Sequence, residues 1–376
     1  MIKVGLKTLG FPQIEKEGEV TLLRNMLIGD GFHWQQSISV RLPGEIEILS
    51  EKEAGQNVSI INTLPLETYL ECVVGSEMNP HSPAEFLKAH AVISRSWVAG
   101  KIRRLHQSSN DGFFSNESTL IGWDDTSSHT GFHVCSDDHC QRYQGLQPIA
   151  DISRDAIRQT AGEVIITPDN SILDTRFSKC CGGKTELFST CWQPLDFTGL
   201  ESFDDPWCDL SDLTPASRRS LLSSVLKDYD SGTEGHGFRW QTTVSKKEIA
   251  RNLKNRFERD LGEIISVNPL HRGPSGRIDL LHIKGTKGSL NLGKELWIRR
   301  LLSPTHLYSS AFEIEDRGET LVLTGKGWGH GVGLCQIGAA RMATAGYDYR
   351  RILSFYYPHT RIGKIPETIR ASKSPS

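Results

Sequence analysis

The sequence has no hydrophobic run that approaches the roughly 20 residues needed to span a bilayer, so a membrane-spanning helix is not expected. It also has almost no excess of charge. With 43 basic and 45 acidic side chains the formal net charge is −2, which argues against a general nucleic-acid-binding or membrane-surface protein. We find no internal repeat or low-complexity tract. What remains is a chain of 376 residues with an ordinary hydrophobic share of 37%, enough for about two globular lobes.

The pattern along the chain predicts a mixed α+β fold, with strands and helices in two lobes. Residues 1–62 are rich in strand patterns, beginning with Met1 to Leu6, which reads as a strand and lacks the apolar core of a signal peptide. Residues 63–362 form the main region, in which segment 210–262 carries helical patterns and segment 277–292 a strand pattern. Residues 363–376 form a tail.

Two helices are predicted on either side of Glu77. Pro65 suits a first helical position, and apolar residues recur after it at helical spacing. Ser82 is a capping residue followed by a first-turn proline, and opens the second helix. Gly75 and Asn79 interrupt the pattern between them. We therefore expect Glu77 on a short loop between two helices, from which a side chain can point into a cleft.

A polar stretch between His129 and Cys140 holds three histidines and two cysteines, a donor set that suits zinc. The preferred ligands are His129, Cys135, His139 and Cys140, with His133 in reserve. Four protein ligands would close the site, so the zinc ion is expected to be structural. The alternative is a polar loop with a disulfide between Cys135 and Cys140.

Six further cysteines are less informative. Cys72 lies in a predicted helix and is most simply a small buried hydrophobic residue. Cys180 or Cys181 could form a disulfide with Cys191 or Cys208, but the pairing cannot be deduced from the sequence.

A third feature is the glycine-rich run from Gly325 to Gly333, where glycine stands at every second position. The missing side chains allow a backbone or a ligand to approach closely. His330 lies within the run, either as a hydrogen-bonding part of the turn or as a group that contacts substrate. A helix is predicted from Leu334 to Ala345, with Gly346 as its C-terminal stop.

These segments resemble the SpoIID/LytB family, whose sporulation members cut peptidoglycan glycan strands and whose other members modulate cell-wall amidases. The resemblance extends from about residue 45 to 362. It rests on the segment from Leu64 to Trp97 around Glu77, on the Cys-Gly-Gly turn at Cys181, and on the Trp-Gly-His-Gly motif at Trp328. Sporulation-type members also carry a zinc-binding His/Cys cluster. His90, where the family usually has Gln, and Trp97, where it has Tyr, depart from the pattern.

The resemblance implies that the region 63–362 is catalytic and surrounds a substrate cleft. The implied reaction is that of a lytic transglycosylase, which cleaves the β-1,4 bond between N-acetylmuramic acid and N-acetylglucosamine in peptide-stripped strands. Glu77 would be the general acid and base, with a pKa raised by a partly apolar cleft. Arg95 would orient it or bind substrate, unless it forms an ordinary ion pair. The substrate-binding residues would be Gly329, His330, Gly331, Gln336 and Tyr356, although a core role is also open for Tyr356.

Two other functions remain open at this point. A non-catalytic peptidoglycan-binding module that enhances an amidase could use the same glycine-rich surface. A zinc hydrolase acting on stem peptides would need three protein ligands and an open coordination position. The expected partners are glycan strands and, for the enhancer, a cell-wall amidase. The expected location is the periplasm or cell envelope.

Overall fold

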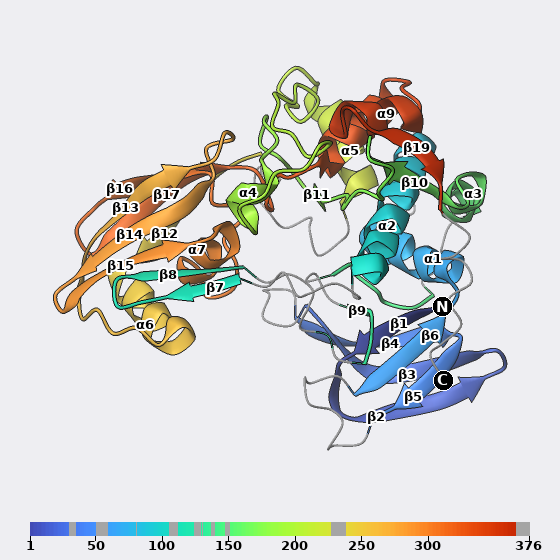
Figure 1. Cartoon of the computed structure of the whole chain (residues 1–376), viewed down its shortest axis with the longest axis horizontal. Helices are drawn as coiled ribbons and strands as arrows, with labels where there is room; N and C mark the ends of the chain where they lie inside the picture. Colours follow the sequence, from blue (N-terminus) through green and yellow to red (C-terminus); the bar gives the residue numbers. More distant parts are fainter. Residues whose placement is uncertain are drawn as a thin grey trace.

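The computed structural model describes the chain with interruptions, and the ranges are these: 1–29, 35–49, 59–79, 81–104, 112–123, 129, 131–136, 140–146, 151–226 and 238–365. His139 lies outside them. The mixed α+β class predicted from the sequence is confirmed (Figure 1).

The N-terminal strands form two small sheets, at the lower right of Figure 1. One has the order β5-β6-β1-β9 and the other β2-β3-β4. The two-residue strand β9 pairs in parallel with β1, which places Cys135 opposite Gly5 at the edge of the sheet. The strands are β1 (Ile2–Leu6), β2 (Thr8–Glu17), β3 (Val20–Ile28), β4 (Gln36–Pro43), β5 (Glu45–Ile48), β6 (Ile60–Leu64) and β9 (Val134–Cys135).

Above these sheets lies a helical part, built around the long helix α2. Two short strand pairs connect its distant segments: β10 with β19 and β11 with β18. The elements are α1 (Leu66–Glu77), α2 (Ala84–Arg104), α3 (Asp151–Gln159), β10 (Glu163–Ile166), β11 (Phe177–Ser178), α4 (Phe188–Cys191), α5 (Pro215–Val225), β18 (Leu334–Cys335), α8 (Gln336–Thr344), α9 (Tyr349–Tyr356) and β19 (Arg361–Lys364).

The left side of Figure 1 is a distal lobe made of a five-stranded sheet, β13-β14-β15-β8-β7, and a three-stranded sheet, β12-β17-β16. The hairpin of β7 and β8 comes from the segment after α2, so the lobe combines two separate parts of the chain. Its elements are β7 (Gly112–Ser115), β8 (Thr119–Trp123), β12 (Arg239–Ser245), α6 (Lys246–Phe257), β13 (Ile264–Arg272), β14 (Ile278–Gly285), β15 (Gly288–Gly293), α7 (Glu295–Leu301), β16 (Phe312–Asp316) and β17 (Thr320–Lys326).

Among the described residues, the two largest hydrophobic cores separate the distal lobe from the rest of the molecule. One core joins the N-terminal strands to the helices, from Ile2 through Phe86 to Tyr357. The other fills the distal lobe, from Leu120 to Leu323. The strands of residues 1–62 therefore bury their apolar faces together with α1 and α2.

The predicted helices were found with shifted ends. Pro65 is the N-cap of α1 rather than its first helical residue. In segment 210–262, α5 begins at Pro215, where Thr214 accepts a hydrogen bond from the Ser217 N–H as a cap. The second helix of this segment, α6, begins at Lys246 and ends at Phe257.

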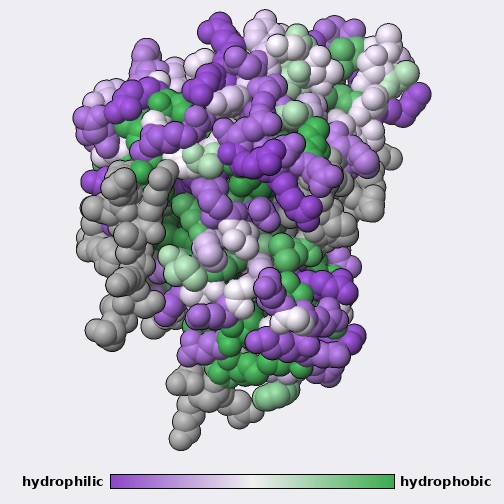
Figure 2. All heavy atoms as spheres, turned by 90° about the vertical axis from the view of Figure 1, so that its right-hand side faces the viewer, coloured by the Kyte–Doolittle hydropathy of each residue, from purple (hydrophilic) through white to green (hydrophobic). Residues whose placement is uncertain are grey.

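Figure 2 shows the face that lies at the right of Figure 1. Its upper, helical part is mainly hydrophilic, and hydrophobic residues gather lower down, over the N-terminal strands. Among the helices in the described residues, none is long and apolar enough to cross a membrane.

Candidate functional site

Glu77 is the last residue of α1, so the prediction that it lies on the loop after the helix was wrong by one residue. Its side chain is half-buried, and Oε1 accepts a hydrogen bond of 2.9 Å from the backbone N–H of Arg142. The residue is thus held by its own helix and by a loop 65 residues away. The described contact uses the backbone of Arg142, so no side-chain signal in the sequence points to it.

The loop that holds Glu77, residues 140–146, is fastened to α1 at two other points. Ser76 accepts a hydrogen bond of 2.8 Å from the Gln144 N–H, and the Tyr69 hydroxyl donates one of 3.0 Å to Gln141. The backbone N–H of Tyr143 donates a hydrogen bond to the carbonyl of Ser136. The loop is therefore a rigid partner of the last turn of α1.

Three of the four predicted metal ligands converge at the start of this loop. The ligand atoms of His129, Cys135 and Cys140 lie within 4.8 Å of one another, and His129 Nε2 is 3.7 Å from Cys140 Sγ. The reserve ligand His133 accepts a hydrogen bond from the Lys3 backbone through Nδ1 instead. The donor set of one imidazole and two thiolates fits a zinc ion. His139, the predicted fourth ligand, lies outside the described residues.

A buried cation accompanies the cluster. The ammonium group of Lys101 donates to Cys140 Sγ at 3.5 Å and lies 5.5 Å from the centre of the Trp97 ring. Its side chain is 1% exposed. A positive charge beside a sulfur favours the thiolate form, which is the form that binds metals.

Arg95 is fully buried and makes a two-pronged ion pair with Glu67, with distances of 2.9 and 2.7 Å. Its remaining hydrogen bonds go to the backbone carbonyls of Ala91 and Glu163. Arg95 thus connects α1, α2 and β10 and makes no hydrogen bond to Glu77. The placement favours the ion-pair interpretation over a direct role at the carboxyl group.

The glycine-rich run wraps around a buried arginine that the sequence did not single out. Arg277 is fully buried and donates two hydrogen bonds to the carbonyl of Gly329 and one to that of Cys181. A Cβ atom on Gly327 or Gly331 would lie 2.7 or 2.5 Å from the guanidinium group. The glycines therefore make room for Arg277, at positive φ angles that favour glycine.

His330 is half-buried beside the Trp192 ring, at 4.9 Å between ring centres. Its Nδ1 accepts a hydrogen bond from the Val332 N–H, so Nε2 carries the proton of the neutral ring. Burial, together with the guanidinium groups of Arg176 and Arg277, lowers the pKa of His330 well below its ordinary value. The side chain is a neutral donor at physiological pH.

The other two predicted substrate-binding residues are buried. Tyr356 donates a hydrogen bond of 2.9 Å to Asp205, and Gln336 is 2% exposed with its amide 3.3 Å from His90 Nε2. These placements favour a structural role for both side chains in the packing of the surrounding helices. For Tyr356 this is the core role that the sequence left open.

His90 links α2 to α8. Its burial predicts that the folded state becomes less stable in acid. Burial, with a smaller effect of Lys179, lowers its pKa to about 3, so the ring is neutral above that pH. The unfolded chain binds the proton near pH 6.5. The contribution of the neutral, buried His90 ring to the free energy of unfolding is therefore complete above pH 6.5 and is lost as the pH falls toward 3. Between pH 6.5 and 4.5 the free energy of unfolding decreases by about 2–3 kcal/mol.

We expect His90→Gln, which introduces the residue usual in the family, to remove this part of the pH dependence. Urea unfolding of both proteins at pH 7 and pH 4.5 measures it. The stability of the variant relative to the original chain should rise on acidification. An equal difference at the two pH values would contradict the assignment.

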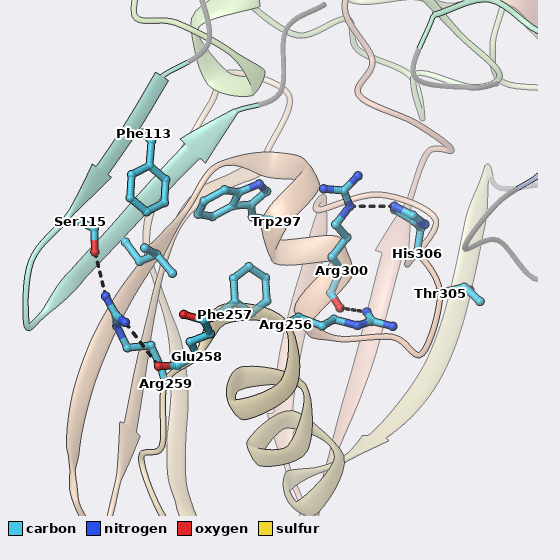
Figure 3. Close-up of a pocket in the computed structure, with 11 residues that line it drawn as sticks. Phe113, Ser115, Arg256, Phe257, Glu258, Arg259, Trp297, Arg300, Thr305 and His306 are labelled. Atoms are coloured by element: carbon cyan, nitrogen blue, oxygen red, sulfur yellow. Dashed lines mark hydrogen bonds between the residues drawn. The ribbon is translucent and has the colours of Figure 1, made fainter. Parts of the chain in front are cut away.

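A separate pocket of about 810 Å³ lies in the distal lobe (Figure 3). Trp297 packs between Phe113 and Phe257, with ring centres 5.9 and 5.6 Å apart. Arg256, Arg259 and Arg300 surround these rings. The pocket combines aromatic faces with guanidinium groups, and none of its lining residues was predicted from the sequence.

Comparison with known families gives two matches. Residues 54–166, which include Glu77, Arg95 and the His/Cys cluster, match the family model described as Stage II sporulation protein (SpoIID). Residues 186–333 match a domain of unknown function, DUF8618, and this segment includes most of the distal lobe. Residues 54–166 are therefore similar to the SpoIID family, and the predicted resemblance to the SpoIID/LytB family is confirmed.

Individual relatives support this assignment along most of the chain. Stage II sporulation protein D of Bacillus subtilis is 26% identical over 304 residues, covering 81% of this chain and 76% of the relative. An uncharacterized protein of Brachyspira hyodysenteriae is 26% identical over 299 residues, or 79% of this chain and 66% of the relative. The amidase enhancer of Bacillus subtilis is 26% identical over 226 residues, or 55% of this chain and 32% of the relative.

Proposed function

We propose that this protein acts on the bacterial cell wall as a peptidoglycan lytic transglycosylase, with Glu77 as its general acid and base. The observation that carries the proposal is the support of this carboxyl group at the end of α1, where the Arg142 N–H fixes one oxygen and leaves the group half-exposed. The SpoIID family match over this segment supports the choice of substrate.

In the proposed reaction, Glu77 protonates the oxygen that links N-acetylmuramic acid to N-acetylglucosamine. The bond from this oxygen to C1 of the muramic acid breaks, and the 6-hydroxyl of the same sugar attacks C1. Glu77, now ionised, takes the proton of that hydroxyl. The products are a 1,6-anhydro end and a free 4-hydroxyl, and no water is consumed. One carboxyl group suffices because the substrate supplies the nucleophile, unlike in ordinary glycosidases.

A structural zinc ion held by His129, Cys135 and Cys140 would stabilise the loop that fixes Glu77. The metal ligand and the group that holds Glu77 are close in the chain. Cys140 lies two residues before Arg142, whose N–H donates to the Glu77 carboxyl group. The ion would act as a cross-link and takes no part in the proposed proton transfers. His139 is the proposed fourth ligand.

Among the side chains proposed to contact the glycan, His330 is the least buried, and contact would require its Nε2–H to exchange the Phe177 carbonyl for a sugar hydroxyl. Gly329 and Gly331 would contribute through their backbone. Gln336 and Tyr356 would act by supporting α8 and α9, in keeping with their burial.

The proposal is tested by digesting purified, peptide-stripped glycan strands and analysing the products by mass spectrometry. We expect 1,6-anhydro ends, which lack one water relative to the reducing ends that a hydrolase makes. Reducing ends would identify a hydrolase instead. Binding of strands without any cleavage would support the second candidate function.

That second candidate is a non-catalytic amidase enhancer, favoured by the similarity to a protein of that name. It would bind glycan strands and a cell-wall amidase through the same surface. In a mixture with an amidase, an enhancer would raise the release of stem peptides even when Glu77 is replaced. In either function the site of action would be the cell envelope, where peptidoglycan lies.

A further inference from the structure

A second cluster of metal-binding side chains lies in the core of the helical part. Cys181, Asp205, Cys208 and Cys335 are each at most 1% exposed, and their ligand atoms lie within 4.8 Å of one another. They come from the Cys-Cys-Gly-Gly turn after β11, from the segment before α5, and from β18 at the start of α8. We infer that these four residues form a second, buried zinc site that joins the three segments.

The distances are close to those of a four-coordinate ion. With zinc–sulfur and zinc–oxygen bonds of about 2.3 and 2.0 Å, tetrahedral ligand atoms lie about 3.5–3.8 Å apart. Cys181 Sγ is 3.2 Å from Asp205 Oδ2. Only small shifts of these side chains are needed to admit the ion.

Two backbone groups donate hydrogen bonds to the sulfur of Cys335, which offset part of the burial that raises the pKa of its thiol. The Cys181 N–H and the Gly338 N–H donate to its sulfur at 3.3 and 3.5 Å. Cys335 is the N-cap of α8, whose N-terminal N–H groups and dipole favour a negative charge there. A cysteine sulfur is also a far better zinc ligand than a hydroxyl group.

Asp205 is held in the manner of a metal-binding carboxylate. The Tyr356 hydroxyl donates to Oδ2 at 2.9 Å, and the Trp207 N–H donates to Oδ1 at 3.0 Å. Such hydrogen bonds from neighbouring groups orient metal ligands. A carboxylate buried among thiols is costly without a cation, and the ion removes that cost.

A disulfide between Cys180 and Cys208 is the alternative, since their sulfur atoms are 3.4 Å apart. It would use Cys208 and would leave Cys181, Cys335 and Asp205 buried together without a cation. A metal ion explains why all four side chains lie together and why Tyr356 and Trp207 hold Asp205 in place. The disulfide explains only the position of Cys208. Cys180 then lies beside the site as a neighbour of Cys208.

The site would stabilise the glycine-rich run independently of the reaction. Cys335 pairs with Ser178 across β11 and β18, and Cys181 provides the carbonyl that Arg277 binds. The zinc ion would thus fix the turn, the start of α8 and the surroundings of Arg277 as one unit.

The test is the zinc content of the full chain, purified without chelators in the presence of a reductant. We expect the variant Cys208→Ser/Cys335→Ser to hold one zinc ion fewer per chain than the original, and Cys72→Ala, a buried control outside both clusters, to hold the same number. An unchanged zinc content in the double variant would overturn the inference. So would a Cys180–Cys208 disulfide in a second sample purified without reductant, seen as two cysteines that stay unalkylated after denaturation.

A second measurement covers the case in which the double variant fails to fold. Cys140→Ser removes a ligand from the other cluster and leaves this one intact. When it is loaded with cobalt(II) alone, we expect the intense absorption of cobalt–thiolate bonds and of a tetrahedral ion. Their absence in the folded protein would overturn the inference, whatever the outcome of the glycan digests.

Discussion

Replacing Glu77 with glutamine should lower the rate of glycan-strand cleavage by about 10²–10⁴-fold, the range of general acid–base catalysis. The amide keeps the size of the side chain, and its oxygen can still accept the Arg142 N–H. It cannot donate the proton to the leaving oxygen or accept the one from the attacking hydroxyl. The effect should therefore fall on kcat and leave strand binding and stability nearly unchanged. Initial rates of anhydro-product formation measure it.

The matched control is Glu71→Gln, which changes a glutamate on the same helix, outside the proposed site. We expect its rate to stay within about twofold of the original. If Glu77→Gln cleaves strands at the original rate, Glu77 is not the catalytic acid. A loss shared equally by both variants would point to damage to α1 rather than to chemistry.

Arg277→Met should cause the largest loss of stability. The substitution removes a buried guanidinium group and leaves the carbonyls of Gly329 and Cys181 without their donor. The Ser275 hydroxyl would lose its link to Arg277, while it still donates to the buried carboxylate of Glu186. Losing one member of such a buried network costs about 3–5 kcal/mol. Urea unfolding at neutral pH measures this free energy.

Arg251→Met serves as the control, because Arg251 lies on α6 with a side chain 65% exposed and a 3.8 Å ion pair to Glu248. Its loss should stay within about 0.5 kcal/mol. Arg277→Lys keeps the positive charge but loses the planar guanidinium group with its several N–H donors. The stability of this variant should therefore fall between those of Arg251→Met and Arg277→Met. A loss below about 1 kcal/mol for Arg277→Met would show that the glycine-rich run does not depend on this arginine.

Local features of the candidate site were predictable because their signals lie close together in the chain. The helices on either side of Glu77 follow from Pro65, Ser82 and helical spacing. The cluster of His129, Cys135 and Cys140 spans only 12 residues, so any compact loop brings these side chains near one another. The end of α1 was misplaced because helix boundaries depend on the contacts of the last turn.

Long-range partners were not predictable in the same way. The sequence places Arg95 on a helix, but its partner could have been Glu77, a ligand or a surface carboxylate. Packing of α1 against α2 brought Glu67 to it. The sequence marks residues 1–62 as strand-rich, but only the structure shows that their apolar residues share one core with α1 and α2.

By itself, the sequence determined the mixed α+β class, the helices around Glu77, the closeness of His129, Cys135 and Cys140, and the resemblance to the SpoIID/LytB family, because each depends on residue types at short spacing. Only the tertiary structure decided which groups meet across 52 to 154 residues. It placed Arg142 on Glu77, Arg277 inside the glycine-rich run, and Cys335 beside Cys181 and Asp205. The physical reason is that the packing of whole helices and strands determines which groups lie next to a buried charge or thiolate. Patterns of residues close together in the sequence do not contain this information.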